Sequence, residues 1–137
     1  MRAYTDFQRA QLAIQNKDTA EASRIARSGE LTSMQKVWTF TSAARLLGNS
    51  ERSRAVELLE DALAESRRIG GSDPDRARAL TAVAAGMVEV DPVRAIQMAK
   101  SFTGEAPRAV ATLAIARSCL RRAKTHWLQS QTELESS

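Results

Sequence analysis

The sequence is poor in residues that interrupt helices or support disulfide and metal frameworks. It has six glycines, three prolines, 4% aromatic residues, one cysteine (Cys119) and one histidine (His126). A single cysteine excludes an intramolecular disulfide, and one residue of each kind is too few for a structural zinc site, which needs four ligands. The scarcity of breaks and of β-branched alternation predicts helices throughout and disfavours strands.

Long apolar runs are also absent. No run approaches the roughly 18 apolar residues of a membrane span, and Met1 to Asn16 lacks the apolar core of a secretory signal. We therefore expect a soluble protein in a reducing, cytoplasmic setting, without a membrane partner. The length of 137 residues predicts one domain at 1–129, followed by a polar, frayed tail at 130–137.

Alanine and arginine are abundant in the chain. There are 24 alanines, and 16 arginines with 4 lysines stand against 16 acidic residues, for a formal net charge of +4. Small side chains in the interior predict closely spaced helices. Arginine favours bidentate contacts with carboxylate or phosphate, so the arginine bias matters for the choice of partner.

A pattern of small and large apolar residues repeats at a distance of forty positions, where 36–59 returns as 76–99. The equivalent pairs include Phe40 and Leu80, Ala44 and Ala84, Leu47 and Met87, and Glu51 and Asp91. A repeat that cannot bury its apolar face alone is stabilised by stacking on its neighbour, so this periodicity predicts a stacked helical array.

Caps and breaks divide the chain into about seven helices. Asp73-Pro74 and Asp91-Pro92 are N-cap signals followed by proline, and Asp18 and Glu21 have capping-box spacing. Gly48-Asn49-Ser50 is expected to end one helix and cap the next. The expected helices span about Thr5 to Asn16, Asp18 to Ser28, Glu30 to Leu47, Glu51 to Ile69, Asp75 to Val90, and Asp91 to Phe102, with a last helix opened by Thr103-Gly104.

This pattern resembles the tandem helical-hairpin repeats of the α-solenoid class, such as tetratricopeptide and HEAT repeats. About one 34-residue unit has tetratricopeptide spacing, at Ala43, Ala55, Leu59 and Ala62. The next unit departs from it at Val83 and Gly86. The resemblance implies an all-α, right-handed array of about seven antiparallel helices, three pairs plus a terminal helix, that acts as a binding scaffold.

We predict a non-enzymatic protein or peptide interaction scaffold without a cofactor. The expected groove residues lie on the first helices of the pairs, at Trp38, Thr41, Arg45, Arg78 and Arg108. Trp38 and Phe40 differ by about 200° around a helix, so they cannot share a face. Phe40 is the expected core residue. Trp38 is then either a groove anchor or a residue packed against the first helix pair.

A basic segment at 106–132 suggests a second function. It has five cations and no acidic residue, and Arg117, Arg121 and Lys124 fall on one helix face. Phosphate binding, including non-specific nucleic-acid binding, would use Arg117, Arg121, Arg122 and Lys124, with Trp127 stacking on a base. The alternative is a solvated helix face.

Other clusters have simpler interpretations. Cys119 and His126 lie seven residues apart, but we expect a buried cysteine, a partly exposed histidine and no metal. No nucleophile elbow or glycine-rich phosphate loop supports catalysis, although a catalytic use of His126 stays an alternative. An acidic ridge at Glu57, Glu60, Asp61 and Glu65 is expected to form weak surface pairs with Arg54 and Arg68.

The last helix has an apolar face without a following partner helix. Its residues are Val110, Leu113, Ala114, Leu120, Trp127 and Leu128. Such a face must be covered by folding back, by a second copy, or by a continuation of the chain. We predict a homodimer through this end.

Overall fold

The computed structural model describes residues 4–70, 73–102 and 105–135. Over these ranges the chain is helical and has no strand, which confirms the expected all-α class. Within 105–135, side chains are described at 112, 115–117 and 119–134. None of the described helices combines the length and the apolar character needed to cross a bilayer.

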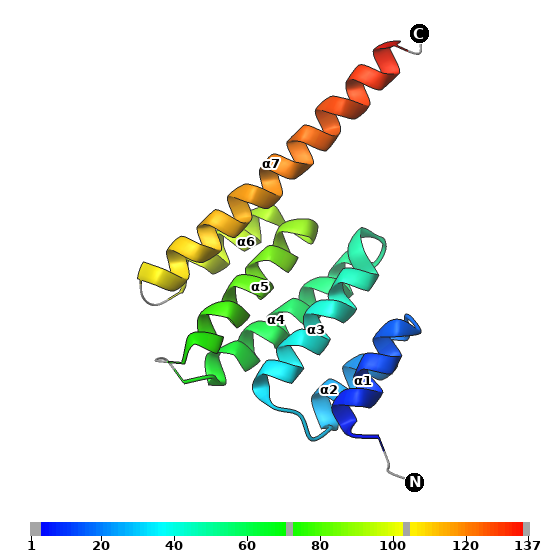
Figure 1. The fold of residues 1–137 in the computed structure, drawn as a ribbon, viewed down its shortest axis with the longest axis vertical. Helices are drawn as coiled ribbons and strands as arrows, with labels where there is room; N and C mark the ends of the chain where they lie inside the picture. Colours follow the sequence, from blue (N-terminus) through cyan, green and yellow to red (C-terminus); the bar gives the residue numbers. More distant parts are fainter. Residues whose placement is uncertain (1–3, 71–72, 103–104, 136–137) are drawn as a thin grey trace.

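The helices pack mainly on their neighbours in sequence. They are α1 (Asp6–Gln15), α2 (Thr19–Ser28), α3 (Ser33–Leu47), the short 3₁₀ helix η1 (Gly48–Glu51), α4 (Arg52–Arg68), α5 (Pro74–Val90), α6 (Pro92–Lys100) and α7 (Glu105–Glu135). In addition, α1, α3, α5 and α7 contact one another in succession and form one layer, with α2, α4 and α6 behind them (Figure 1). The helix α7 continues through 130–135, which was predicted as a tail, and projects beyond the other helices.

Aspartates fix three helix starts where the sequence predicts them. Asp18, Asp73 and Asp91 each accept a hydrogen bond from a backbone N–H in the first turn of the next helix. Pro74 and Pro92 then occupy the first helical position, where a missing N–H costs no hydrogen bond. The other expected breaks, at 71–72 and 103–104, lie outside the described residues.

The third helix begins later than predicted, at Ser33 rather than near Glu30. Thr32 caps it through a reciprocal capping box with Gln35. The Thr32 hydroxyl accepts from the Gln35 N–H at 3.1 Å, and the Gln35 side chain accepts from the Thr32 N–H at 3.0 Å. This arrangement satisfies two backbone donors at once, so it defines the helix start.

The fourth helix also begins later, at Arg52, because η1 lies between α3 and α4. The prediction that Gly48-Asn49-Ser50 supplies the N-cap of this helix is wrong, because the N-cap position is Glu51 and Ser50 bonds elsewhere. The Ser50 hydroxyl donates to the Leu47 carbonyl at 2.7 Å and so completes the end of α3. Gly48 turns the chain with φ +55°, a conformation that glycine adopts without strain.

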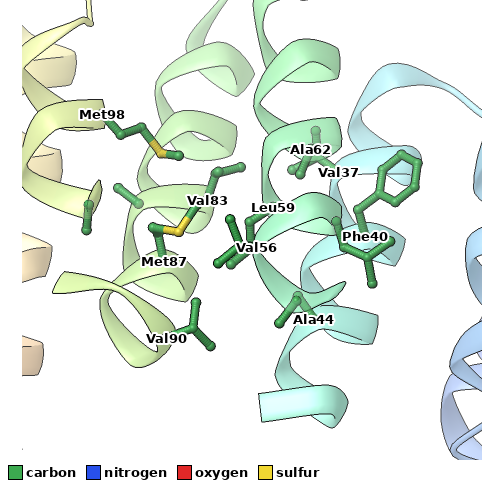
Figure 2. Packing of buried hydrophobic residues seen from close by; sticks show 14 of the residues in the cluster. Val37, Phe40, Ala44, Val56, Leu59, Ala62, Val83, Met87, Val90 and Met98 are labelled. Carbon is green, nitrogen blue, oxygen red and sulfur yellow. The ribbon is translucent and has the colours of Figure 1, made fainter. Parts of the chain in front are cut away.

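Buried apolar side chains form one cluster from α2 to α7, shown in part in Figure 2. Leu59, 1% exposed, lies in α4 between residues of α3 and of α5. Phe40 is buried, as predicted. Most of the apolar positions related by the forty-residue repeat are buried in both copies, including Phe40 and Leu80, Ala43 and Val83, Ala44 and Ala84, Leu47 and Met87, Ala55 and Ala95, Leu58 and Met98, and Leu59 and Ala99.

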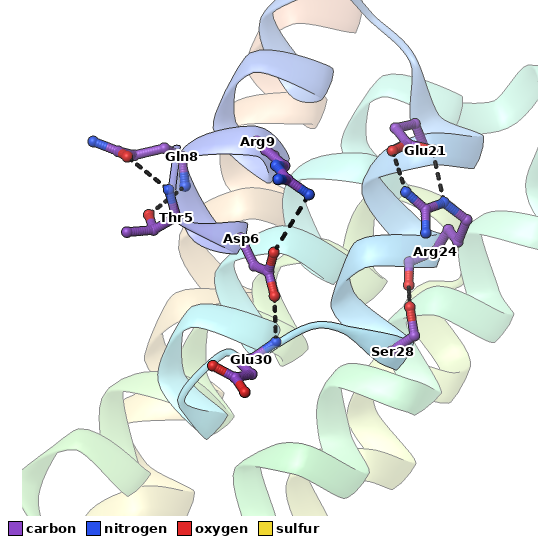
Figure 3. A network of polar contacts seen from close by, with 8 residues as sticks. All are labelled: Thr5, Asp6, Gln8, Arg9, Glu21, Arg24, Ser28 and Glu30. Carbon is purple, nitrogen blue, oxygen red and sulfur yellow. Dashed lines mark hydrogen bonds and ion pairs between the residues drawn. The ribbon is translucent and has the colours of Figure 1, made fainter. Parts of the chain in front are cut away.

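Polar contacts organise the N-terminal end (Figure 3). Asp6 accepts a hydrogen bond from the backbone N–H of Glu30 at 2.7 Å, which ties α1 to the loop before α3. In α2, Arg24 donates two hydrogen bonds to Glu21. These bonds lower the pKa of Glu21 and raise the pKa of Arg24. The Glu21 carboxylate is therefore directed to Arg24, and the capping interaction in this turn is the bond from the Glu21 N–H to Asp18.

Candidate functional site

A cavity opens where α3, η1, α5 and α7 meet. Its volume is about 430 Å³, and its walls are formed by Ala44, Arg45, Gly48, Asn49, Ala85, Gly86, Glu89, Val90 and Arg121. These residues come from segments far apart in the sequence, brought together because α3, α5 and α7 contact one another in succession. A volume of this order suits a small ligand or a few residues of a peptide.

Small residues form much of the cavity wall. Ala44 of α3 faces it together with Ala85 and Gly86 of α5. A Cβ added at Gly86 would lie 2.9 Å from Leu59 Cδ2, so glycine at this position allows α5 to approach α4 closely. With no large side chain on these positions, the backbone of a ligand has room beside α3 and α5.

Two arginines line this cavity and have no partner among the described residues. Arg45 comes from α3 and Arg121 from α7, and neither guanidinium makes an ion pair or hydrogen bond within the described part of the chain. By contrast, Arg27, Arg52 and Arg94 are paired with carboxylates on neighbouring helices. One carboxylate, Glu89, lines the same cavity. The cavity thus offers two planar sets of donors that match carboxylate or phosphate oxygens.

Arg122 makes a contact between helices that the sequence did not predict. Its guanidinium donates to the Val88 carbonyl at 2.8 Å, in the last turn of α5, where carbonyl groups lack helical partners. The cationic end of Arg122 also suits the negative end of the α5 dipole. This contact anchors α7 to α5 and places the adjacent Arg121 at the cavity. This bond uses one N–H group of the Arg122 guanidinium, and phosphate binding by Arg122 stays a prediction.

We expect Arg122→Met to lower the free energy of unfolding by about 1 kcal/mol, because methionine keeps much of the aliphatic chain but cannot donate to the Val88 carbonyl. Urea unfolding measures this loss. Arg121→Met is the matched control on the same helix and should change the stability by less than about 0.5 kcal/mol. Equal losses in the two variants would contradict the anchoring role.

The remaining cations of the predicted basic strip are exposed on α7. Arg117, Arg121 and Lys124 all face solvent. Of these, Arg121 lines the cavity described above. Arg108 was predicted both in the strip and in the groove, and its side chain lies outside the described residues.

Trp38 packs against the first helix pair, which is the second of its two predicted roles. Its ring lies edge-to-face with Phe7 of α1, with the ring centroids 5.4 Å apart and an interplanar angle of 76°. Trp38 is still 39% exposed, but it does not line the cavity. Trp38, which was predicted as a possible groove anchor, therefore forms part of the contact between α1 and α3.

Thr41 and Arg78 also lie outside the cavity. The Thr41 hydroxyl donates to the Val37 carbonyl at 2.8 Å, one helical turn back. Arg78 forms a 3.6 Å surface pair with Asp75. Of the predicted groove residues with described side chains, the cavity contains Arg45.

The expected burial of Cys119 is wrong, because its side chain is exposed. The helix α7 packs on α5 and α6 along one side, so inward positions such as Ile115 are buried and Cys119 is not. His126 is exposed and lines a wider hollow of about 670 Å³ together with Glu89, Arg121 and Arg122. Among the described side chains, no three His, Cys, Asp or Glu residues are grouped as metal ligands.

The acidic ridge of α4 is paired with cations from both sides. Asp61 pairs with Arg27 of α2 at 2.9 Å, and Glu60 pairs with Arg94 of α6 at 3.2 Å. Glu65 lies 3.4 Å from Arg68, as predicted, and 3.8 Å from Lys36 of α3. The predicted pair between Arg54 and Glu57 is replaced by a 3.1 Å pair between Arg54 and Glu51. The ridge therefore links successive helix pairs.

Sequence reasoning missed Glu89 and Asn49 in the cavity. The forty-residue repeat contained a signal for both, since it relates Asn49 to Glu89 and Arg45 to Ala85, and all four line the cavity. The convergence with Arg121 had no such signal. No known protein-family model matches this chain, and no curated protein or solved structure is significantly similar to it.

Proposed function

We propose that this chain is a non-enzymatic scaffold of helical-repeat type that binds a protein or peptide segment in the cavity between α3, α5 and α7. The observation that carries the proposal is a pair of arginines, Arg45 and Arg121, that have no partner in the described part of the chain and lie in a cavity with small side chains on its wall. Exposed, unpaired arginines beside a concave surface are frequent anchors of protein interfaces.

The proposed architecture is an α-solenoid-like, right-handed array of three helix pairs, α1–α2, α3–α4 and α5–α6, with α7 as the terminal helix. Two observations support it. Helices pack on their sequence neighbours while α1, α3, α5 and α7 contact in succession, and most repeat-related apolar positions are buried in both copies. A chain stacked in this way presents one layer of helices as a continuous binding surface.

The ligand that fits best is a peptide segment bearing carboxylates. Each guanidinium of Arg45 and Arg121 can hold a carboxylate through two parallel hydrogen bonds. Glu89 provides an acceptor for a backbone N–H or a cationic side chain of the same segment. The small residues Ala85 and Gly86 leave space for the ligand backbone between these charges.

The same residues argue against nucleic acid as the ligand of the cavity. Glu89 can accept a hydrogen bond from a backbone N–H, which a peptide carries and a sugar–phosphate backbone lacks. Arg122, a member of the predicted phosphate strip, already donates to Val88. Nucleic-acid binding by Arg117, Arg121 and Lys124 is the alternative function, and the DNA titration described below distinguishes it from peptide binding.

The test is fluorescence anisotropy with labelled peptides of equal length, one rich in glutamate and one rich in lysine. We expect the acidic peptide to bind, and Arg45→Glu or Arg121→Glu to weaken binding by about tenfold or more, because each variant replaces a donor by a like charge. Arg78→Glu is the control, since Arg78 is exposed but lies outside the cavity. An equal loss of affinity in all three variants would show that the peptide responds to the net charge of the protein and not to this cavity.

A labelled mixed-sequence DNA duplex, titrated at roughly 50 and 200 mM salt, separates the two functions. The proposal expects the acidic peptide to bind and the duplex not to bind at the lower salt. Duplex binding that depends on Arg117 and Lys124, with a log-log salt slope of about −0.9 per phosphate contact, would identify nucleic acid as the ligand instead.

A further inference from the structure

The C-terminal half of α7 carries large apolar side chains in solvent. Leu120, Trp127 and Leu134 are 70%, 58% and 77% exposed and follow one another at intervals of seven residues. Leu120 comes just before Arg122, which contacts α5, and α7 continues from there into its projecting end (Figure 1). Three such residues in register on one helix form a stripe that needs an explanation, whereas single exposed apolar residues do not.

The stripe lies on the side of α7 that faces away from the other helices. Arg122 defines the inner side of α7 through its bond to Val88. Ile115, which lies about 20° from Arg122 around the helix, is buried on the same side. At about 100° per residue, Leu120 lies about 160° from Arg122 around the helix, and Trp127 and Leu134 lie within about 40° of Leu120. The positions three residues after Leu120 and Trp127 are the small Ala123 and Ser130. Small residues at these positions allow a second helix to approach the stripe closely.

We propose that a second copy of this chain covers the stripe, with the two α7 helices antiparallel about a two-fold axis near Trp127. The charge of the segment selects this orientation. Residues 117–124 contain four cations and no acid, and two of them, Arg117 and Lys124, take no part in the inner contacts of Arg121 and Arg122, whereas residues 133–135 contain two glutamates and no cation. Antiparallel pairing brings the acidic tip of each copy beside the basic part of the other, and parallel pairing would bring like charges together.

The register follows from the spacing. With Trp127 opposite its own copy, Leu120 lies at the level of the partner's Leu134, and the overlap of residues 119–135 is about 25 Å long. The helices α5 and α6 pack on the other side of α7, so the rest of each copy leaves the seam free. This contact uses a face of α7 other than the one at the peptide cavity, and it does not depend on the proposed function.

Sedimentation velocity over a range of concentrations tests the dimer. We expect Trp127→Glu to weaken the association by at least tenfold, since it would bring two carboxylates together at the axis. Gln129→Glu is the matched control, because it adds the same charge on the inner side and should leave the dimer intact. Circular dichroism verifies that both variants are helical. A wild-type monomer at about 1 mM, or equal effects of the two variants, would overturn the proposal.

The native Cys119 tests the orientation, because it is exposed and is the only cysteine in the chain. A spin label at this position reports the distance to its copy by pulsed electron paramagnetic resonance. The antiparallel register places the two Cys119 Cα atoms roughly 26 Å apart, and a parallel, in-register pair places them about 10 Å apart. A dominant short distance would overturn the antiparallel arrangement.

Discussion

Leu59→Ala is expected to lower the free energy of unfolding by about 2–5 kcal/mol, the largest loss we predict for a single truncation in this protein. Leu59 is 1% exposed and lies in α4 between α3 and α5 (Figure 2). Removing its side chain loses apolar contact and leaves a void that the surrounding helices can only partly close. Urea unfolding followed by circular dichroism measures the loss.

Two variants make this test specific. Leu46→Ala is the matched control, because Leu46 is 39% exposed on α3 and its truncation should cost less than about 1 kcal/mol. Gly86→Ala probes the same contact from α5. Its added Cβ would lie 2.9 Å from Leu59 Cδ2, so it should be less unfavourable in the Leu59→Ala background, by about 0.5–3 kcal/mol. Strict additivity would show that Leu59 and Gly86 do not limit the approach of α4 and α5.

Asp91→Ala is expected to destabilise the protein by about 1–2 kcal/mol, because its carboxylate both caps α6 and pairs with Arg52 of α4. Asp91 ends α5 and caps α6, where its side chain accepts from the Arg94 N–H at 3.1 Å. The same carboxylate lies 3.5 Å from Arg52 of α4. Alanine leaves the Arg94 N–H without this acceptor and removes the ion pair.

Asp91→Asn separates these contributions. Asparagine is as good an N-cap as aspartate, so this variant keeps the cap and loses only an exposed ion pair worth less than about 1 kcal/mol. We expect urea midpoints in the order wild type, Asp91→Asn, Asp91→Ala, with the larger step between the two variants. If asparagine cost as much as alanine, the charge rather than the cap would stabilise this junction.

Local chemistry made several helix starts predictable. Asp73-Pro74 and Asp91-Pro92 cap the helices they were expected to cap, because a short acceptor side chain followed by proline acts within one turn. The predicted starts of α3 and α4 were too early, and the helices begin at Ser33 and Arg52. The start of α3 depends on Thr32 acting as its N-cap. The start of α4 depends on the 3₁₀ turn before it, where the Ser50 hydroxyl bonds to the Leu47 carbonyl instead of capping α4.

The candidate site was only partly predictable. Arg45 was chosen from its helix face, and Arg121 was chosen from a run of cations for a different function. Their shared cavity depends on how α3 and α7 sit on α5, which no local pattern specifies. Trp38 shows the converse. Its helix face was read correctly, but contact with Phe7 gives it a packing role.

The sequence by itself determined the all-α class, the aspartate caps and most of the core, because capping and amphipathic periodicity act over a few residues. The tertiary structure decided which exposed arginines are paired. It also decided which of two repeat-related residues is buried where the two copies differ in burial. Val56 is buried at a hollow that Asp91 and Arg94 also line, whereas its equivalent Ile96 is 46% exposed on α6. The physical reason is that pairing and burial depend on the helix that packs alongside, and that neighbour is set by the assembled array.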